Sequence, residues 1–150
     1  MITIETYILH DNDFVKVAPD TDIHFITDTF YIEGAIVIKV FGQEVLGLRH
    51  WDLVDQLWSY FIDAVEELLN GRQEAGFLFP DQPLSVELRV EKKNRDRLLI
   101  NIGGKKYAVD KREFLSKLLS AAEIFYGFLG QCVDSSILLQ KVQKLRNHLL

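Results

Sequence analysis

The sequence predicts an α+β protein in which an antiparallel sheet of about six or seven strands packs against three helices. Apolar residues alternate with polar ones at the N-terminus and again over residues 84–109, which is the period of half-buried strands. Between these runs, and again after them, the apolar residues recur every three or four positions, as in amphipathic helices. Hairpins rather than alternating strand–helix units favour the antiparallel arrangement. The 150 residues are expected to form one domain.

The N-terminal strands come first. Ile2, Ile4, Thr6 and Ile8 share one side of an extended segment, and Phe14–Val17 can form a short edge strand. Residues 23–48 are expected to form two or three strands, with His24 on a strand face. The nearly continuous apolar run over residues 35–41 predicts a central strand covered on both faces.

The first helix is predicted from about Asp52 to Asn70. Its apolar stripe contains Val54, Leu57, Trp58, Phe61, Val65 and Leu68. Asp52 fits the N-cap or first turn, where the helix dipole favours an acid. Asn70-Gly71 supplies the left-handed residue that ends many helices. Residues 76–84 (GFLFPDQPL) then read as a turn-rich connector because proline cannot donate a ladder hydrogen bond.

A three-strand meander and two further helices complete the prediction. The strands start near Leu84, and Gly103-Gly104 fits a two-residue hairpin loop. Asp110 followed by Glu113 resembles a capping box for a helix that ends at Gly130. Asp134 can cap a last helix over about residues 135–148.

The composition of the chain limits the class of protein to which it can belong. No stretch approaches the roughly 18 continuous apolar residues of a membrane span, and the N-terminus lacks the pattern of a signal peptide. Cys132 is the only cysteine, which excludes an internal disulfide and a thiolate zinc cluster. We therefore expect a cytoplasmic protein with no membrane partner.

The charge is segregated along the chain. Residues 1–81 hold 15 acidic and 4 basic side chains, whereas residues 82–150 hold 7 acidic and 13 basic ones. Either the two halves neutralise each other in space, or one of them forms a partner surface.

The sequence predicts no catalytic residues, no metal site and no cofactor. The four histidines are far apart and none has a second ligand at metal-binding spacing. Cys132, Ser135 and Ser136 lie at a helix junction without a paired base. The Gly103–Lys106 segment lies between strands, whereas a phosphate loop opens a helix.

The basic segment 89–112 admits two interpretations, a functional patch or protection of sheet edges. Its nine cations are Arg89, Lys92, Lys93, Arg95, Arg97, Lys105, Lys106, Lys111 and Arg112. Only Tyr107 is available there to stack on a base, so nucleic acid is not the expected partner.

The acidic first helix is the candidate partner-binding site. Its residues are Asp52, Asp55, Asp63, Glu66 and Glu67, and no Lys or Arg lies between Leu53 and Asn70. A helix face that tolerates this repulsion suits a cationic partner. The alternative is an ordinary solvated face balanced by the basic strands.

The overall pattern resembles small acidic bacterial proteins of the kind that includes immunity proteins for polymorphic toxins. The resemblance rests on the alternating N-terminal strands, the Trp51–Gly71 helix, the FPDQP connector at Phe79–Pro83 and the Asp110–Gly130 helix. It covers most of the chain as architecture and contains no diagnostic motif. It implies stoichiometric binding that covers a toxin's active site, which suits the acidic half of this chain better than the basic half.

We therefore predict a non-enzymatic protein-binding module, of the immunity or antitoxin kind, that binds another, basic protein through the acidic face. The alternative is a small-ligand-binding domain or an unrecognised enzyme. Its pocket would lie between sheet and helices and would use Tyr7, Tyr31, Trp58, Tyr126 or Cys132. Homo-oligomerisation through a sheet edge or the C-terminal helix is a third possibility.

Overall fold

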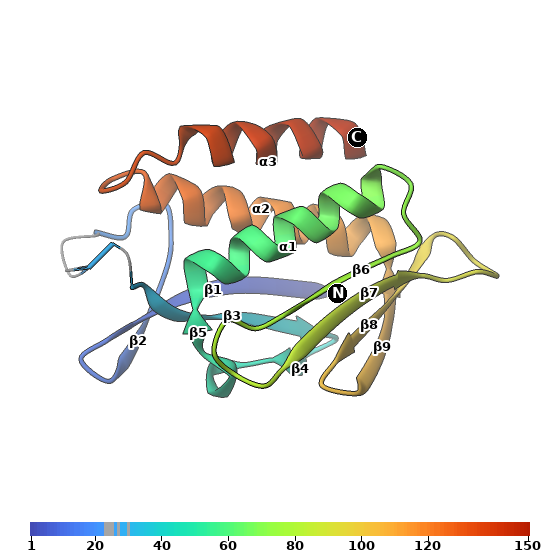
Figure 1. Ribbon diagram of the computed structural model, residues 1–150, viewed down its shortest axis with the longest axis horizontal. Helices are drawn as coiled ribbons and strands as arrows, with labels where there is room; N and C mark the ends of the chain where they lie inside the picture. Colours follow the sequence, from blue (N-terminus) through green and yellow to red (C-terminus); the bar gives the residue numbers. More distant parts are fainter. Residues whose placement is uncertain (23–25, 27, 30) are drawn as a thin grey trace.

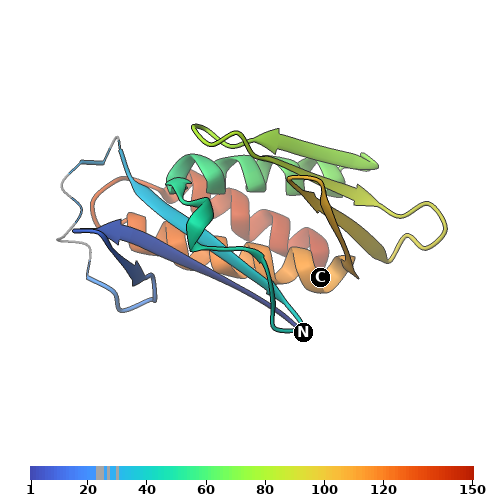
Figure 2. The same ribbon diagram turned by 90° about the horizontal axis from the view of Figure 1, so that it is seen from below.

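The chain forms two antiparallel sheets that share one layer of helices (Figures 1 and 2). The structure, a computed structural model, describes residues 1–22, 26, 28–29 and 31–150. His24 and part of the strands predicted over residues 23–48 lie outside the described residues. The α+β class, the antiparallel pairing and the three helices are confirmed.

The first sheet has the strand order β2-β1-β3-β4, and the short β5 also pairs with β3. Its strands are β1 (Ile2–His10), β2 (Asp13–Lys16), β3 (Glu33–Val40), β4 (Gln43–Leu46) and β5 (Asp52–Leu53). A single 3₁₀ turn, Leu48–His50, connects β4 to β5. As predicted, β3 is central and its residues are mostly buried.

The second sheet is a simple meander in the order β6-β7-β8-β9. Its strands are β6 (Glu74–Leu78), β7 (Ser85–Val90), β8 (Arg97–Ile102) and β9 (Lys105–Asp110). The prediction of one sheet with six or seven strands was therefore wrong, because nine strands are divided between two sheets. Both β4 and β5 pair with β3 on the side away from β1, and the chain then crosses through a helix before β6 begins.

The three helices lie on one side of the sheets (Figure 1). They are α1 (Val54–Leu69), α2 (Lys111–Leu129) and α3 (Ser136–Leu149). α1 packs on β6 and β3, α2 packs on β1 and β9, and α3 lies on α1 and α2 away from the sheets. α3 buries only Val142 and Leu145 among its side chains, so it forms an outer layer.

One hydrophobic cluster joins the two sheets and the helices. Trp58 on α1 is fully buried in it and stacks against Phe125 of α2, with ring centroids 6.3 Å apart. The indole N–H of Trp58 donates to the Thr6 hydroxyl at 3.1 Å, so the Thr6 side of β1 faces the helices. No helix among the described residues has the length and apolar character needed to cross a membrane.

The helix caps are partly as predicted. The Asp110 carboxylate accepts a hydrogen bond from the backbone N–H of Glu113 at 2.9 Å and caps α2. Asp134 lies one residue before the N-cap of α3 and accepts from the backbone N–H of Ser136 at 3.1 Å. The N-cap of α1 is Leu53, so Asp52 is not in the cap or first turn of that helix.

Candidate functional site on the helical face

Asp52 is a buried structural residue. Only 2% of its surface is exposed, and its carboxylate accepts backbone hydrogen bonds from Leu53 at 2.7 Å, Asp81 at 3.0 Å and Gln82 at 2.9 Å. These bonds hold the β6–β7 loop against β5. Asp52 is therefore not available to a partner, and the acidic face consists of the other four predicted carboxylates.

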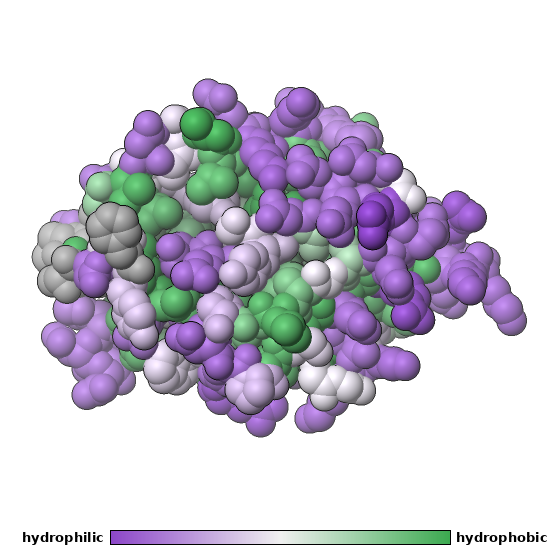
Figure 3. All heavy atoms as spheres, in the orientation of Figure 1, coloured by the Kyte–Doolittle hydropathy of each residue, from purple (hydrophilic) through white to green (hydrophobic). Residues whose placement is uncertain are grey.

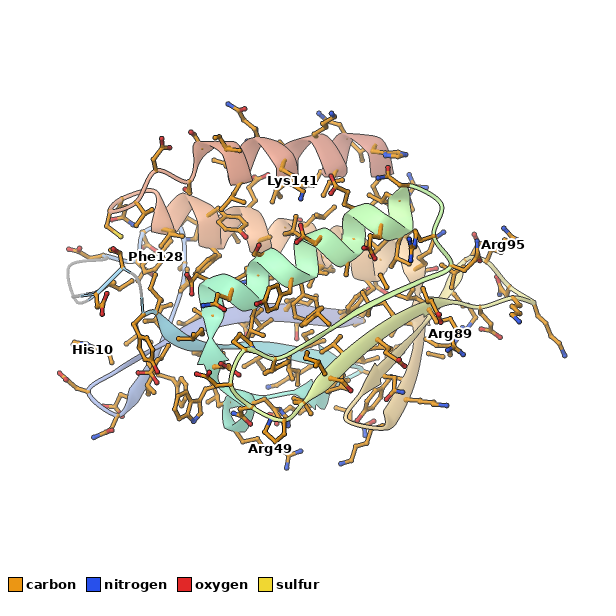
Figure 4. The ribbon with its side chains drawn as sticks, viewed as in Figure 1. His10, Arg49, Arg89, Arg95, Phe128 and Lys141 are labelled. Carbon is orange, nitrogen blue, oxygen red and sulfur yellow. The ribbon has the colours of Figure 1, made fainter. Side chains whose placement is uncertain are left out.

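Asp63 and Glu66 point from α1 towards α3 and share one cation. The Lys141 ammonium lies 2.9 Å from Asp63 and 3.2 Å from Glu66 (Figure 4). Partial burial acts to lower the pKa of Lys141, but hydrogen bonds and attraction from the two carboxylates raise the pKa above its ordinary value. The sequence pattern missed this pairing because the partner lies 78 residues away from Asp63.

Glu67 lies on the other side of α1, towards β6. It lines a hollow of about 280 Å³ together with Arg72, Glu74 and Arg89. The predicted acidic residues therefore do not form one solvent-facing stripe, because α1 presents them to two different neighbours.

Asp55 has no ion pair among the described residues. It is half-buried, and this desolvation raises the pKa of its carboxyl group despite opposing hydrogen bonds from the backbone N–H groups of Gln56 and Asp55. Desolvation disfavours the charged form unless a cation compensates for it. Asp55 is thus the carboxylate of α1 with the most to gain from an external cation.

The Tyr126 hydroxyl lies close enough to be affected by the same carboxylates. Burial raises the pKa of Tyr126 well above its ordinary value, and the charges of Asp55 and Asp63 raise it further. Among the described residues, its hydroxyl is the buried side-chain polar atom that has no hydrogen-bond partner. A buried polar group without a partner costs about 1–3 kcal/mol.

Exposed apolar side chains lie near the start of α3. Ile137 is 80% exposed and precedes Lys141 by one helical turn, which places both on the same side of α3. Val133, just before the helix, is also exposed. Figure 3 shows hydrophobic surface over this end of the helical layer. We call Asp55, Asp63, Glu66, Ile137 and Lys141 the α1–α3 face.

The residues named for a ligand pocket do not gather in one place. Trp58 and Tyr126 are buried in the core, whereas Tyr7 lies on the opposite side of β1 from the helix-facing Thr6. Tyr31 lines a small surface hollow with His10, and Cys132 lies exposed at the α2–α3 junction.

A different hollow, of about 490 Å³, lies between α2 and α3. Arg112, Glu123 and Arg146 are among its lining residues. Arg146 pairs with Glu123 at 2.7 Å, and Arg112 donates to the carbonyl oxygen of Leu149, so these three charged groups already have partners. The hollow is a surface groove outside the sheet–helix core.

The residues considered for catalysis are not arranged as a catalytic group. Cys132 is exposed, but partial desolvation of its thiol raises the pKa, which works against a reactive thiolate. Ser135 donates its hydroxyl to the Tyr126 carbonyl at 2.7 Å, and Ser136 donates to Asp134 at 2.7 Å. Among the described residues, no three His, Cys, Asp or Glu side chains are grouped as metal ligands would be.

The basic segment lies mainly on the second sheet and its hairpin ends. Arg89 pairs with Glu74 at 3.1 Å, and Arg97 lies 3.6 Å from Glu91. Arg95 extends from the far end of the β7–β8 hairpin (Figure 4). These cations therefore lie apart from the α1–α3 face, whose own cation is Lys141.

Comparisons with protein-family models, with curated proteins and with solved structures find no match to this chain.

Proposed function

We propose that this protein is a non-enzymatic binding module that holds a basic protein partner on the α1–α3 face, as an immunity or antitoxin-like inhibitor would. The observation that carries the proposal is Asp55, a half-buried carboxylate that has no ion pair among the described residues. Its charged form is unfavourable in the isolated chain, because it is partly desolvated without a compensating cation.

A lysine or arginine from a partner would relieve this state. Its charged N–H groups would donate to the Asp55 carboxylate and compensate for the desolvation of that group. Hydrogen bonds to charged groups contribute about 1.5–3 kcal/mol, more than an exposed surface ion pair. Asp55 is therefore a better candidate contact than Glu67, which faces β6, or Asp63, which Lys141 already neutralises in part.

The apolar neighbours support a protein rather than a free ion as the partner. Ile137 and Val133 lie exposed at the same end of the helical layer. Binding energy in protein interfaces concentrates where apolar contacts exclude water around a charged or aromatic anchor. The net negative charge of the α1–α3 face would also accelerate the approach of a basic protein.

A capture experiment with matched charge variants tests the proposal. Tagged protein is used to capture partners from native lysate at low salt and at about 0.5 M salt, where the Debye length is only a few ångströms. We expect a stoichiometric basic protein that is lost with Asp55→Lys and weakened by Ile137→Ser. Asp13→Lys makes the same charge change at an exposed position on β2 and should leave capture unchanged.

Equal capture by the Asp55→Lys and Asp13→Lys proteins would show that the α1–α3 face is not the contact. An acidic partner whose capture survives high salt would contradict the expected chemistry.

A further inference from the structure

The second sheet ends in a strand, β6, whose outer edge is unpaired among the described residues. β6 is the terminal strand of the order β6-β7-β8-β9, and in Figure 2 it forms the outer margin of that sheet. Among the described residues, no strand pairs with its outer side.

The free hydrogen-bonding groups of β6 can be assigned from its ladder to β7. At the two ends of the ladder, the N–H of Phe79 donates to Leu84 and the carbonyl of Gln73 accepts from Val90. Ladder bonds in an antiparallel pair involve every second residue, so Ala75 and Phe77 also bond to β7. The N–H and C=O groups of Glu74, Gly76 and Leu78 therefore point to the open edge.

This edge lacks the features that usually prevent strand addition. Natural edge strands are short, or carry lysines, prolines or bulges. β9 carries Lys105 and Lys106, and β2 is only four residues long. β6 reads Glu-Ala-Gly-Phe-Leu, has a regular register with β7, and exposes 72% of Leu78.

We propose that β6 is a self-association edge, at which a second copy of this chain adds its own β6 in antiparallel register about Gly76. This register opposes Glu74 to Leu78 of the second copy and Gly76 to Gly76 of the second copy. In this register, all three residues whose N–H and C=O groups point to the open edge are paired in each copy. A shift by one residue towards the C-terminus would oppose Glu74 to Pro80, which has no N–H.

The side chains fit this register on both faces of the sheet. On the helix-covered face, Phe77 would lie beside Ala75 of the second copy, whose small side chain leaves space for the ring. On the open face, the exposed Leu78 would lie beside Glu74 and Gly76 of the second copy. The 280 Å³ hollow opens at this edge, and Glu74 and Gly76 are among its lining residues. Each copy thus supplies one exposed leucine and one Glu74–Gly76 surface to the other, as a two-fold interface requires.

Sedimentation velocity and light scattering at micromolar concentration provide the first test. We expect a concentration-dependent dimer for the natural sequence. A monomer across the whole concentration range would overturn the proposal.

A charge swap tests the strand and its register. Leu78→Glu should weaken self-association by about a hundredfold or more, because two-fold symmetry removes two leucine contacts and opposes two pairs of carboxylates. Adding Glu74→Lys to Leu78→Glu should restore the dimer, because each lysine then faces a glutamate. Ser85→Glu is the matched control, since Ser85 is exposed and lies opposite Leu78 on β7, away from the edge. A dimer unaffected by Leu78→Glu would overturn the assignment to β6.

Cysteine cross-linking tests the β6–β6 register even if the Leu78→Glu protein fails to fold. In a Cys132→Ser background, Glu74→Cys and Leu78→Cys proteins are oxidised separately and as a mixture. Only the mixture should form a disulfide dimer, because residue 74 faces residue 78 and not itself. Gly76 is left unchanged, because a Cβ there would lie 2.6 Å from the Val86 carbonyl oxygen. Absence of cross-linking in the mixture would overturn the register.

The β6 edge and the α1–α3 face can be tested independently. The Leu78→Glu monomer should still capture the partner, because Leu78 is not part of the α1–α3 face. Loss of capture by Asp55→Lys should likewise leave the dimer intact.

Discussion

At the residue scale, Asp52 shows how a buried carboxylate can organise a fold. Its carboxylate accepts hydrogen bonds from the backbone N–H groups of Asp81 and Gln82, which lie in the loop between β6 and β7, outside the strand ladder. Charged acceptors of this kind make stronger hydrogen bonds than neutral ones. The Asp52 carboxylate thus stabilises the fold. The sequence had predicted instead that it caps a helix and contacts a partner.

We expect Asp52→Ala to lower the free energy of unfolding by about 3 kcal/mol, because it leaves two loop N–H groups without an acceptor. Urea unfolding followed by circular dichroism measures the change. Asp81→Ala is the matched control in the same loop, since it removes an exposed side chain, and it should cost less than about 0.5 kcal/mol. Similar losses in both proteins would contradict the role of the Asp52 carboxylate.

Asp55 should make stability depend on pH in the opposite sense to a paired carboxylate. Its pKa is raised in the folded chain, so the folded protein binds a proton more tightly than the unfolded one. Stability then falls as the pH rises from the ordinary pKa of the carboxyl group through its raised value. Above that window the charged form carries the full desolvation cost.

Asp55→Asn should therefore be more stable than the natural protein near neutral pH, by a few tenths of a kcal/mol after allowance for its half exposure. The gain should disappear as the pH falls through this window. Urea unfolding at a series of pH values measures it. Asp63→Asn should give no gain, because it removes a partner of Lys141. A destabilised Asp55→Asn protein at neutral pH would show that Asp55 has a stabilising partner.

At the element scale, the quality of the prediction followed the clarity of each local pattern. The apolar stripe of α1 and the alternation of β7 predicted those elements well, since both patterns arise from burial of one face. Residues 76–78 of β6 were assigned to a connector because Pro80 and Pro83 follow closely. Only its pairing with β7 and its contact with α1 identify it as a strand.

α3 is expected to be the least stable helix. It buries two side chains, whereas α2 buries ten, and part of its attachment to α1 is the exposed Lys141 bridge. Local opening occurs where few apolar contacts hold an element.

Amide hydrogen exchange should therefore be faster in α3 than in α1 or α2 under native conditions. Lys141→Ala should increase the exchange of α3 by about two- to fivefold, in keeping with the 0–1 kcal/mol of a surface ion pair. Lys144→Ala is the control, because Lys144 is exposed on the same helix and has no ion pair among the described residues. Protection of the α3 amides from exchange equal to that of the α1 amides would contradict the prediction that α3 is the least stable helix.

At the scale of the whole molecule, the sequence predicted the class of fold but neither the division into two sheets nor the site. Strand pairing between distant segments leaves no periodic signal, so β5 and β6 could not be assigned to different sheets. The acidic character of α1 was read directly from its residues. The burial of Asp52, the pairing of Asp63 and Glu66 with Lys141 and the partial burial of Asp55 all depend on tertiary packing.

The hydrogen bonds of Asp52 also bear on the order of events during folding. They connect residues 29 and 30 positions apart and enclose only α1 and β6. Closing a loop of this length costs less entropy than pairing the distant ends of the chain, and contacts between nearby residues favour rapid folding. The segment from β5 to the β6–β7 loop can therefore become ordered early in folding. The packing of α2, near the other end of the sequence, against β1 would follow later.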